Sequence, residues 1–191
     1  MRAWAHQFRR YLIAAPLVLA LGFGWNVWDG WHGNDGSAHR AKDVPKGKPV
    51  QWGPNTVEFV GLKVEQPHKS SSGFDTSTAP RNAVVVVASF RARIDDVEGY
   101  KKFYCDSKVQ NDDGWIWPAI SGGVPDQYVP PNTPKNCDGK TLNKDFKDVV
   151  PEPHTWYRFA FGYYVPKSRA HGLRPTLEFY KENPTYLRFS S

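Results

Sequence analysis

The hydrophobic pattern divides the chain into an apolar start and a long, mostly polar remainder. Residues 11–28, YLIAAPLVLALGFGWNVW, form the one long apolar run, and no Asp, Glu, Lys or Arg interrupts it. At a rise of about 1.5 Å per residue, roughly 18 helical residues span about 27 Å, close to the hydrocarbon thickness of a bilayer. The run therefore predicts a transmembrane helix, a signal anchor that contacts the lipid bilayer through residues 11–28.

Charges and aromatic residues beside this run predict its orientation. Basic residues next to a membrane segment stay on the cytoplasmic side. Three of them, and no acid, precede the run: Arg2, Arg9 and Arg10. Aromatic residues suited to the membrane–water boundary lie at its two ends: Tyr11, Trp25, Trp28 and Trp31. We expect a cytoplasmic basic tail at 1–10 and an extracytoplasmic C-terminal part in the cell membrane.

A cleaved secretory signal is the competing interpretation of the same segment. Both kinds of segment combine a basic start with an apolar core, and Ala20-Leu21-Gly22 offers small residues for cleavage. The apolar run continues through Trp28, which favours a retained anchor, whereas cleavage would release a secreted protein. No Cys lies just after the core, which excludes a lipoprotein anchor. Either alternative places the remainder outside the cytoplasm.

The pattern after the anchor separates a linker from a β domain. Residues 29–49 contain scattered Gly, Pro and charge without apolar periodicity, which predicts a flexible linker. From residue 50 to 191, short alternating segments are separated by turn residues. The strongest are 83–95 and 156–165, each with one continuously apolar face. In 57–64 the apolar parity switches at Val60-Gly61, which predicts a β-bulge.

These segments predict an all-β domain, an antiparallel two-sheet sandwich of about seven strands. Residues 111–114, NDDG, have the composition of a tight hairpin turn. The two cysteines of the chain, Cys105 and Cys137, lie in the part expected outside the cytoplasm. Such a pair predicts one disulfide. A redox pair would favour C-x-x-C spacing, and a zinc site would need further ligands nearby.

The chain resembles the uncharacterised telokin-like or immunoglobulin-like extracellular proteins of bacteria, especially actinobacteria. The resemblance depends on AVVVVASFRARID, the hairpin FYCDSKVQNDDGWIWP, and WYRFAFGYYVP followed by LRF near the end. It covers roughly residues 50–189 behind a single basic-flanked apolar helix and a Gly/Pro linker. It implies an immunoglobulin-like sandwich that acts outside the cytoplasm. It implies no catalytic residue, because fold alone does not give function.

Sequence motifs for catalysis and cofactors are absent. The chain has no G-x-S-x-G elbow, H-E-x-x-H helix or phosphate-binding glycine loop. His154 and the acid pairs Asp95-Asp96 and Asp112-Asp113 flank strands, which is typical of surface and turn residues. We therefore predict no enzyme activity and no catalytic residue, cofactor or metal ligand. An extracytoplasmic hydrolase stays the least favoured alternative.

Net charge argues against a nucleic-acid partner. The formal charge is +6, but three of the 25 Lys and Arg residues lie in the tail, which has no acid. The rest of the chain therefore has 22 basic residues against 19 acidic ones, an excess of only three positive charges. A nucleic-acid interface would need clustered basic residues on one face.

The aromatic content, 15% of the chain with eight Trp, is the positive hint of a binding surface. Four aromatic residues share the expected solvent faces of two strands: Trp115, Trp117, Trp156 and Tyr164. If exposed together, they would form a strip suited to a protein or a glycan. Alternatively, they pack beneath the Pro-rich loops.

The leading hypothesis is a membrane-anchored protein-interaction module, such as an accessory subunit of an envelope or membrane complex. The alternative is a cell-wall or carbohydrate-binding domain.

Overall fold

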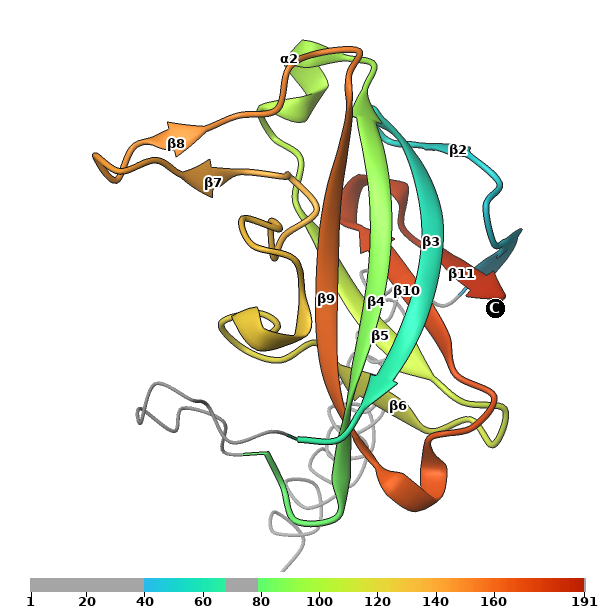
Figure 1. Cartoon of the computed structure of the whole chain (residues 1–191). Helices are drawn as coiled ribbons and strands as arrows, with labels where there is room; N and C mark the ends of the chain where they lie inside the picture. The colour runs from blue at the N-terminus through green and yellow to red at the C-terminus, as the bar shows by residue number, and fades with distance from the viewer. Residues whose placement is uncertain (1–39, 68–78, 191) are drawn as a thin grey trace, which may run out of the picture. The chain divides into compact units, whose positions relative to one another are not determined.

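The apolar alternation of 83–95 places this segment inside a four-stranded antiparallel sheet. The computed structural model describes residues 40–67 and 79–190. In the four-stranded sheet the order is β2-β3-β4-β9. Its strands are β2 (Val50–Trp52), β3 (Asn55–Glu65), β4 (Ala83–Ile94) and β9 (Trp156–Pro166). Figure 1 shows β3, β4 and β9 side by side as long, curved strands.

The second sheet contains five strands in the order β1-β11-β10-β5-β6. They are β1 (Arg40–Pro45), β11 (Thr185–Ser190), β10 (Arg174–Phe179), β5 (Cys105–Gln110) and β6 (Ile116–Pro118). All neighbours are antiparallel except β1, which pairs in parallel with β11. In Figure 1, β5, β10 and β11 lie behind the four-stranded sheet.

The hydrophobic core lies between the two sheets. Phe90 of β4 is fully buried, and its ring lies 5.2 Å from that of Phe159 in β9 and 5.4 Å from that of Phe189 in β11. The ring of Phe59 in β3 also contacts Phe189, at 5.6 Å. Aromatic rings from both sheets therefore interdigitate, which confirms the predicted β-sandwich.

Short elements connect the sheets. A single-turn helix α2 (Val97–Tyr100) follows β4, and its N-terminus is capped by the Asp96 carboxylate. Three 3₁₀ turns are η2 (Asp126–Tyr128), η3 (Lys167–Arg169) and η4 (Tyr180–Glu182). A small separate hairpin consists of β7 (Thr141–Leu142) and β8 (Asp148–Val149). It leaves the body of the sandwich between η2 and β9.

Local sequence signals for irregular backbone are confirmed. The β3–β4 register shifts between Phe59 and Gly61, where the parity switch predicts a bulge. The NDDG turn joins β5 to β6, with the Gly114 N–H donating to the Asn111 carbonyl at 3.1 Å. Gly114 has φ +85°, a backbone conformation that glycine adopts without strain.

Two expectations about organisation need correction. The main sheets contain nine strands, five and four, rather than about seven. The flexible linker predicted for 29–49 is wrong for residues 40–45, which form β1. Val44 is the one buried residue of this segment, so its order comes from pairing with β11. Asp43 also accepts two hydrogen bonds from the Arg188 guanidinium, at 2.6 and 2.8 Å, and this contact lowers the pKa of the Asp43 carboxyl.

The described residues contain no helix that is long and apolar enough to cross a bilayer. The segment predicted to do so, 11–28, lies outside them, as do the tail at 1–10 and residues 29–39. The predicted topology and interface residues, Arg2, Arg9, Arg10, Tyr11, Trp25, Trp28 and Trp31, lie there too.

A buried polar contact inside the core yields a stability prediction. The Ser107 hydroxyl donates to the Thr176 carbonyl at 2.7 Å, so the Tyr163 hydroxyl, 2.5 Å away, must donate to Ser107. Tyr163→Phe removes this donor, and we expect the free energy of unfolding to fall by about 1–2 kcal/mol. Urea unfolding measures it. The matched control is Tyr180→Phe on an exposed ring, and equal stability of the two variants would contradict the prediction.

Candidate functional site

The predicted disulfide is present. Cys105 at the start of β5 bonds Cys137, 32 residues later, with the two Cα atoms 6.2 Å apart. Both cysteines are buried against the core. The bond therefore fixes the irregular segment 119–138 to the five-stranded sheet, immediately before the β7–β8 hairpin.

Two of the four candidate aromatic residues line one pocket, which we call the aromatic pocket. Trp117 comes from β6 and Tyr164 from β9, so the pocket lies where the edge strands of the two sheets approach. Its volume is about 700 Å³. The remaining lining comes from the turn that leads into β4, the end of β9 and the start of η3: Pro80, Arg81, Asn82, Ala83, Pro166, Lys167 and Ser168.

Both rings in the aromatic pocket are held by packing behind them. Trp117 is half-buried and packs against the main core. Tyr164 packs against a second cluster on the outer face of β4, which includes Val124 and Tyr128. Burial, with a smaller effect of Tyr128, raises the pKa of the Tyr164 hydroxyl. The segment containing Val124 and Tyr128 thus covers part of the sheet, and Trp117 and Tyr164 both stay partly exposed.

The charged side chains among the described lining residues of the aromatic pocket are all basic. Arg81 and Lys167 line it and are exposed, and no acidic side chain is among its lining residues in the described part of the chain. Asn82 and Ser168 add neutral polar groups. A backbone bond from the Lys167 N–H to the Asn82 carbonyl, 2.8 Å, ties the two sides of this wall together. The pocket therefore combines two aromatic rings with two cations.

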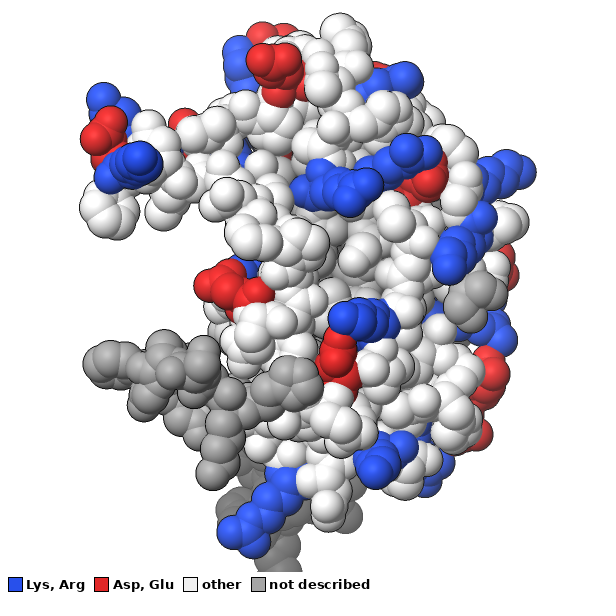
Figure 2. Space-filling view, in the orientation of Figure 1, with Lys and Arg blue, Asp and Glu red and all other residues white. Residues whose placement is uncertain are grey.

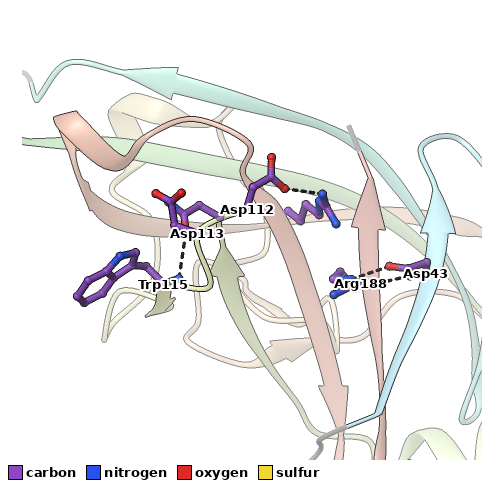
Figure 3. A network of polar contacts seen from close by, with 7 residues as sticks. Asp43, Asp112, Asp113, Trp115 and Arg188 are labelled. Atoms are coloured by element: carbon purple, nitrogen blue, oxygen red, sulfur yellow. Dashed lines mark hydrogen bonds and ion pairs between the residues drawn. The ribbon is translucent and has the colours of Figure 1, made fainter.

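Trp115 directly follows the NDDG turn and precedes β6. Its backbone N–H donates to the Asn111 side-chain oxygen at 3.0 Å. Its indole ring projects away from the Asp112 and Asp113 carboxylates (Figure 3). The Arg169 guanidinium lies 5.1 Å from the ring centroid and also donates to Asp113 at 3.0 Å. Trp115 is half exposed, and it is not among the described lining residues of the aromatic pocket.

Trp156 is separated from the other three aromatic residues. It lies eight residues before Tyr164 on β9, roughly 26 Å along an extended strand. Two guanidiniums of β4 lie over its ring, Arg91 at 4.8 Å and Arg93 at 5.5 Å. These arginines also pair with Glu58 at 2.6 Å and Asp95 at 2.7 Å. Figure 2 shows the resulting group of basic side chains across one end of β9, β4 and β3.

The β7–β8 hairpin displays apolar side chains to solvent. Phe146 at its tip is 83% exposed and Leu142 is 63% exposed, and Val149 and Val150 are about half exposed. The Asn143 side-chain oxygen accepts from the N–H groups of Asp145 and Lys147, each at 2.9 Å, which closes the tip. Figures 1 and 2 show this hairpin standing away from the sandwich.

A recess lies between the base of this hairpin and β5. Its volume is about 1140 Å³, and its walls include Tyr104, Ile120, Pro134, Asp138 and Leu142. Tyr104 is 76% exposed on this side of β5. The recess thus adds a concave, mixed polar and apolar surface beside the projecting hairpin.

The acid pairs of the sequence have structural partners. Asp95 accepts hydrogen bonds from the Thr56 hydroxyl and the Arg93 guanidinium. Burial alone would raise the pKa of the Asp95 carboxyl, but these bonds outweigh it and the pKa is lowered. Asp96 caps α2, and Asp112 pairs with Arg174 (Figure 3). His154 is exposed. In the described part of the chain, no three His, Cys, Asp or Glu residues are grouped to hold a metal ion.

Sequence reasoning missed the two cations of the aromatic pocket and the apolar hairpin. Arg81 and Lys167 flank turns about 85 residues apart, so only the β4–β9 pairing brings them together. The hairpin shows no strand alternation, because each of its strands has only two residues. The sequence feature that could have indicated the hairpin is Phe146, a lone aromatic residue within a charged stretch.

No family model and no curated protein matches the chain. Among solved structures, an uncharacterised β-sandwich protein from Clostridium difficile 630 is similar, with 8% sequence identity and a TM-score of 0.44. The alignment covers 81% of this chain and 97% of that one. The β-sandwich fold of this chain therefore rests on its own strand order and core, and its family stays a prediction.

Proposed function

We propose that this chain is a non-catalytic, membrane-anchored protein-interaction module that binds a protein partner outside the cytoplasm through the β7–β8 hairpin. The observation that carries the proposal is the exposure of Leu142, Phe146, Val149 and Val150 on an element with no core of its own. Leu142 pairs with Asp148 and Val149 with Thr141, so the hairpin exposes apolar side chains on both of its faces. Exposed apolar side chains gathered on one projecting element are costly in water and are typical of protein interfaces.

The backbone of the hairpin tip supports a role for Phe146. It has φ +56°, in the left-handed region, which is uncommon for a bulky side chain. Such conformations cost free energy and tend to persist at functional positions. Here the conformation presents an aromatic ring that contributes almost nothing to the core, as expected of an anchor residue that a partner would bury.

The base of the hairpin is rigid, which favours presentation of the tip to a partner. The Tyr157 hydroxyl donates to the Cys137 carbonyl at 2.8 Å, and the Tyr100 hydroxyl donates to the Asp138 carbonyl. Burial, with a smaller effect of Asp138, raises the pKa of Tyr100 to about 12, so this donor keeps its proton. With the disulfide, these bonds hold the hairpin base, and less ordering entropy is lost on binding.

The strand order supports the immunoglobulin-like expectation for this module. When β3, β4, β5, β6, β9, β10 and β11 are taken as A, B, C, C′, E, F and G, the sheets contain A-B-E and G-F-C-C′. These are neighbours in immunoglobulin domains. A fourth strand beyond E is missing from the described residues, and β1 and β2 are additional. Many interaction domains use such sandwiches as scaffolds for loops.

The anchor part of the proposal depends on the sequence. The uninterrupted apolar run at 11–28 and the three arginines before it favour a single span with the sandwich outside. An anchored module meets partners held in or near the same membrane at a high effective concentration. We therefore expect a membrane or envelope protein as the partner.

A site-directed cross-link tests the hairpin as the interface. Full-length protein carrying the photoreactive amino acid p-benzoylphenylalanine at position 146 is expressed in its own host, irradiated, and purified in mild detergent. We expect one protein cross-linked at position 146, and we expect Leu142→Ser to reduce its yield about tenfold, because buried apolar anchors dominate interface energy.

The matched control places the same photoreactive group at Tyr180, another exposed aromatic residue, in η4. The proposal requires the adduct at 146 and its absence at 180. Equal adducts at both positions, no adduct at 146, or a yield unaffected by Leu142→Ser would each reject the hairpin as the interface.

A further inference from the structure

We propose that the aromatic pocket binds a sugar unit that carries a carboxylate or a phosphate. This inference goes beyond the protein-interaction function and uses a different part of the molecule. The pocket forms at the C-terminal end of β9, whereas the hairpin precedes the N-terminal end of that 11-residue strand. The two sites can therefore be tested separately.

The two rings provide the apolar part of the recognition. Trp117 and Tyr164 are held from behind by different clusters, so their orientations are set before a ligand arrives. The electron-rich face of an aromatic ring attracts polarised C–H groups, and a pyranose ring presents a row of these on one face. The volume of about 700 Å³ is within the range of small-ligand pockets.

The two cations specify the charge of the ligand. Arg81 and Lys167 line the pocket without an acidic side chain among its lining residues in the described ranges. A guanidinium recognises a carboxylate or phosphate by paired hydrogen bonds, and an ammonium adds a mobile charge. A cationic ligand would be repelled, although the aromatic rings alone would suit one. An anionic group on the ligand therefore complements the charge of this lining.

The remaining lining favours a sugar over a wholly apolar acid. Asn82 and Ser168 offer side-chain hydrogen-bond donors and acceptors, and the turns contribute backbone polar groups. A hydrocarbon acid would leave these groups without partners when they are desolvated, which costs free energy. Hydroxyl groups of a sugar can pair with them. The lining therefore matches a ring with one apolar face, several hydroxyls and one anionic substituent.

The test uses calorimetric titration of full-length protein in detergent with defined probes. Trigalacturonate is the acidic probe, and its methyl ester is the neutral match with the same rings. Monomeric galacturonate and glucose 6-phosphate distinguish a free sugar acid or sugar phosphate from a glycan segment, and inorganic phosphate tests the ion alone. We expect binding of acidic sugars, at least tenfold weaker binding of the ester, and weakening as salt increases.

Variants locate the binding. Arg81→Gln and Lys167→Gln are each expected to weaken acidic-sugar binding about tenfold, because each removes one charge-assisted contact. Tyr164→Ala should abolish the heat of binding. Lys102→Gln, at an exposed lysine beside α2, is the matched control and should change nothing.

The outcomes separate the possibilities. Equal affinity for trigalacturonate and its ester, binding of phosphate alone, or no binding of any acidic sugar would overturn the inference. So would equal effects of Lys167→Gln and Lys102→Gln. Phe146→Ser should leave sugar binding unchanged, so loss of the protein partner and loss of sugar binding are distinguishable results.

Discussion

Replacing both Cys105 and Cys137 by Ser is expected to lower the free energy of unfolding by roughly 3–4 kcal/mol. The bond closes a loop over a separation of 32 residues, and the cost of opening it comes mainly from the greater conformational freedom of the unfolded chain. Strands β5 and β6 hold the first part of this loop in the five-stranded sheet, but from residue 119 to Cys137 the only regular element is η2, so no strand pairing replaces the bond there.

The measurement is denaturant unfolding of the wild type and the double variant, each with and without a reducing agent. The reducing agent should destabilise the wild type to the level of the variant and leave the variant unchanged. Because Cys137 lies at the base of the hairpin, the variant should also cross-link less at position 146. A variant as stable as the oxidised wild type would show that packing, rather than the bond, holds this segment.

The sequence predicts the long strands well, because their information is local. In β4 the even positions from Val84 to Ile94 are buried in the main core. Val85 and Val87 are buried too, against Val124 and Tyr128 on the other face. Alternation along a single strand thus indicates which residues are covered. The bulge beside Gly61 and the turn at Gly114 were predictable for the same local reason.

Strand β1 and the candidate surfaces depend on pairing between distant segments. RAKDVP has one buried residue, Val44, and its order comes from a partner almost 150 residues away. Parity indicated that Trp156 and Tyr164 share a face, and the structure places both on β9. Parity contains no information about the opposing sheet edge. It could not predict that Tyr164 lines a pocket with Trp117, whereas two arginines lie over the ring of Trp156.

This separation has a functional consequence. An aromatic strip of four residues would have suggested one broad interface, whereas the structure has three distinct surfaces. The hairpin projects and exposes apolar side chains among charged ones, the aromatic pocket is concave with basic residues in its lining, and Arg91 and Arg93 lie over the ring of Trp156. Different ligands suit the first two, which is why their variants should have independent effects.

Phe90→Ala is expected to destabilise the sandwich by about 3–5 kcal/mol, the usual cost of removing a buried aromatic ring. Phe90 is fully buried, and its ring lies within 5.6 Å of the rings of Phe59, Phe159 and Phe189. These neighbours belong to β3, β9 and β11, so the cavity would open between both sheets. Rigid strands on both sides limit its collapse, and the cost should lie in the upper part of that range.

The hairpin supplies the matched control, since Phe146→Ala removes the same atoms from a ring that is 83% exposed. The free energy of unfolding of the Phe146→Ala variant should stay within about 0.5 kcal/mol of that of the wild type, as for most surface substitutions. Denaturant unfolding measures both variants. Phe146→Ala should nevertheless lose the protein partner, whereas a partly destabilised Phe90→Ala should keep it under native conditions. If instead Phe146→Ala were the more destabilised variant, the ring would be packed, and the hairpin would be part of the fold rather than a surface for a partner.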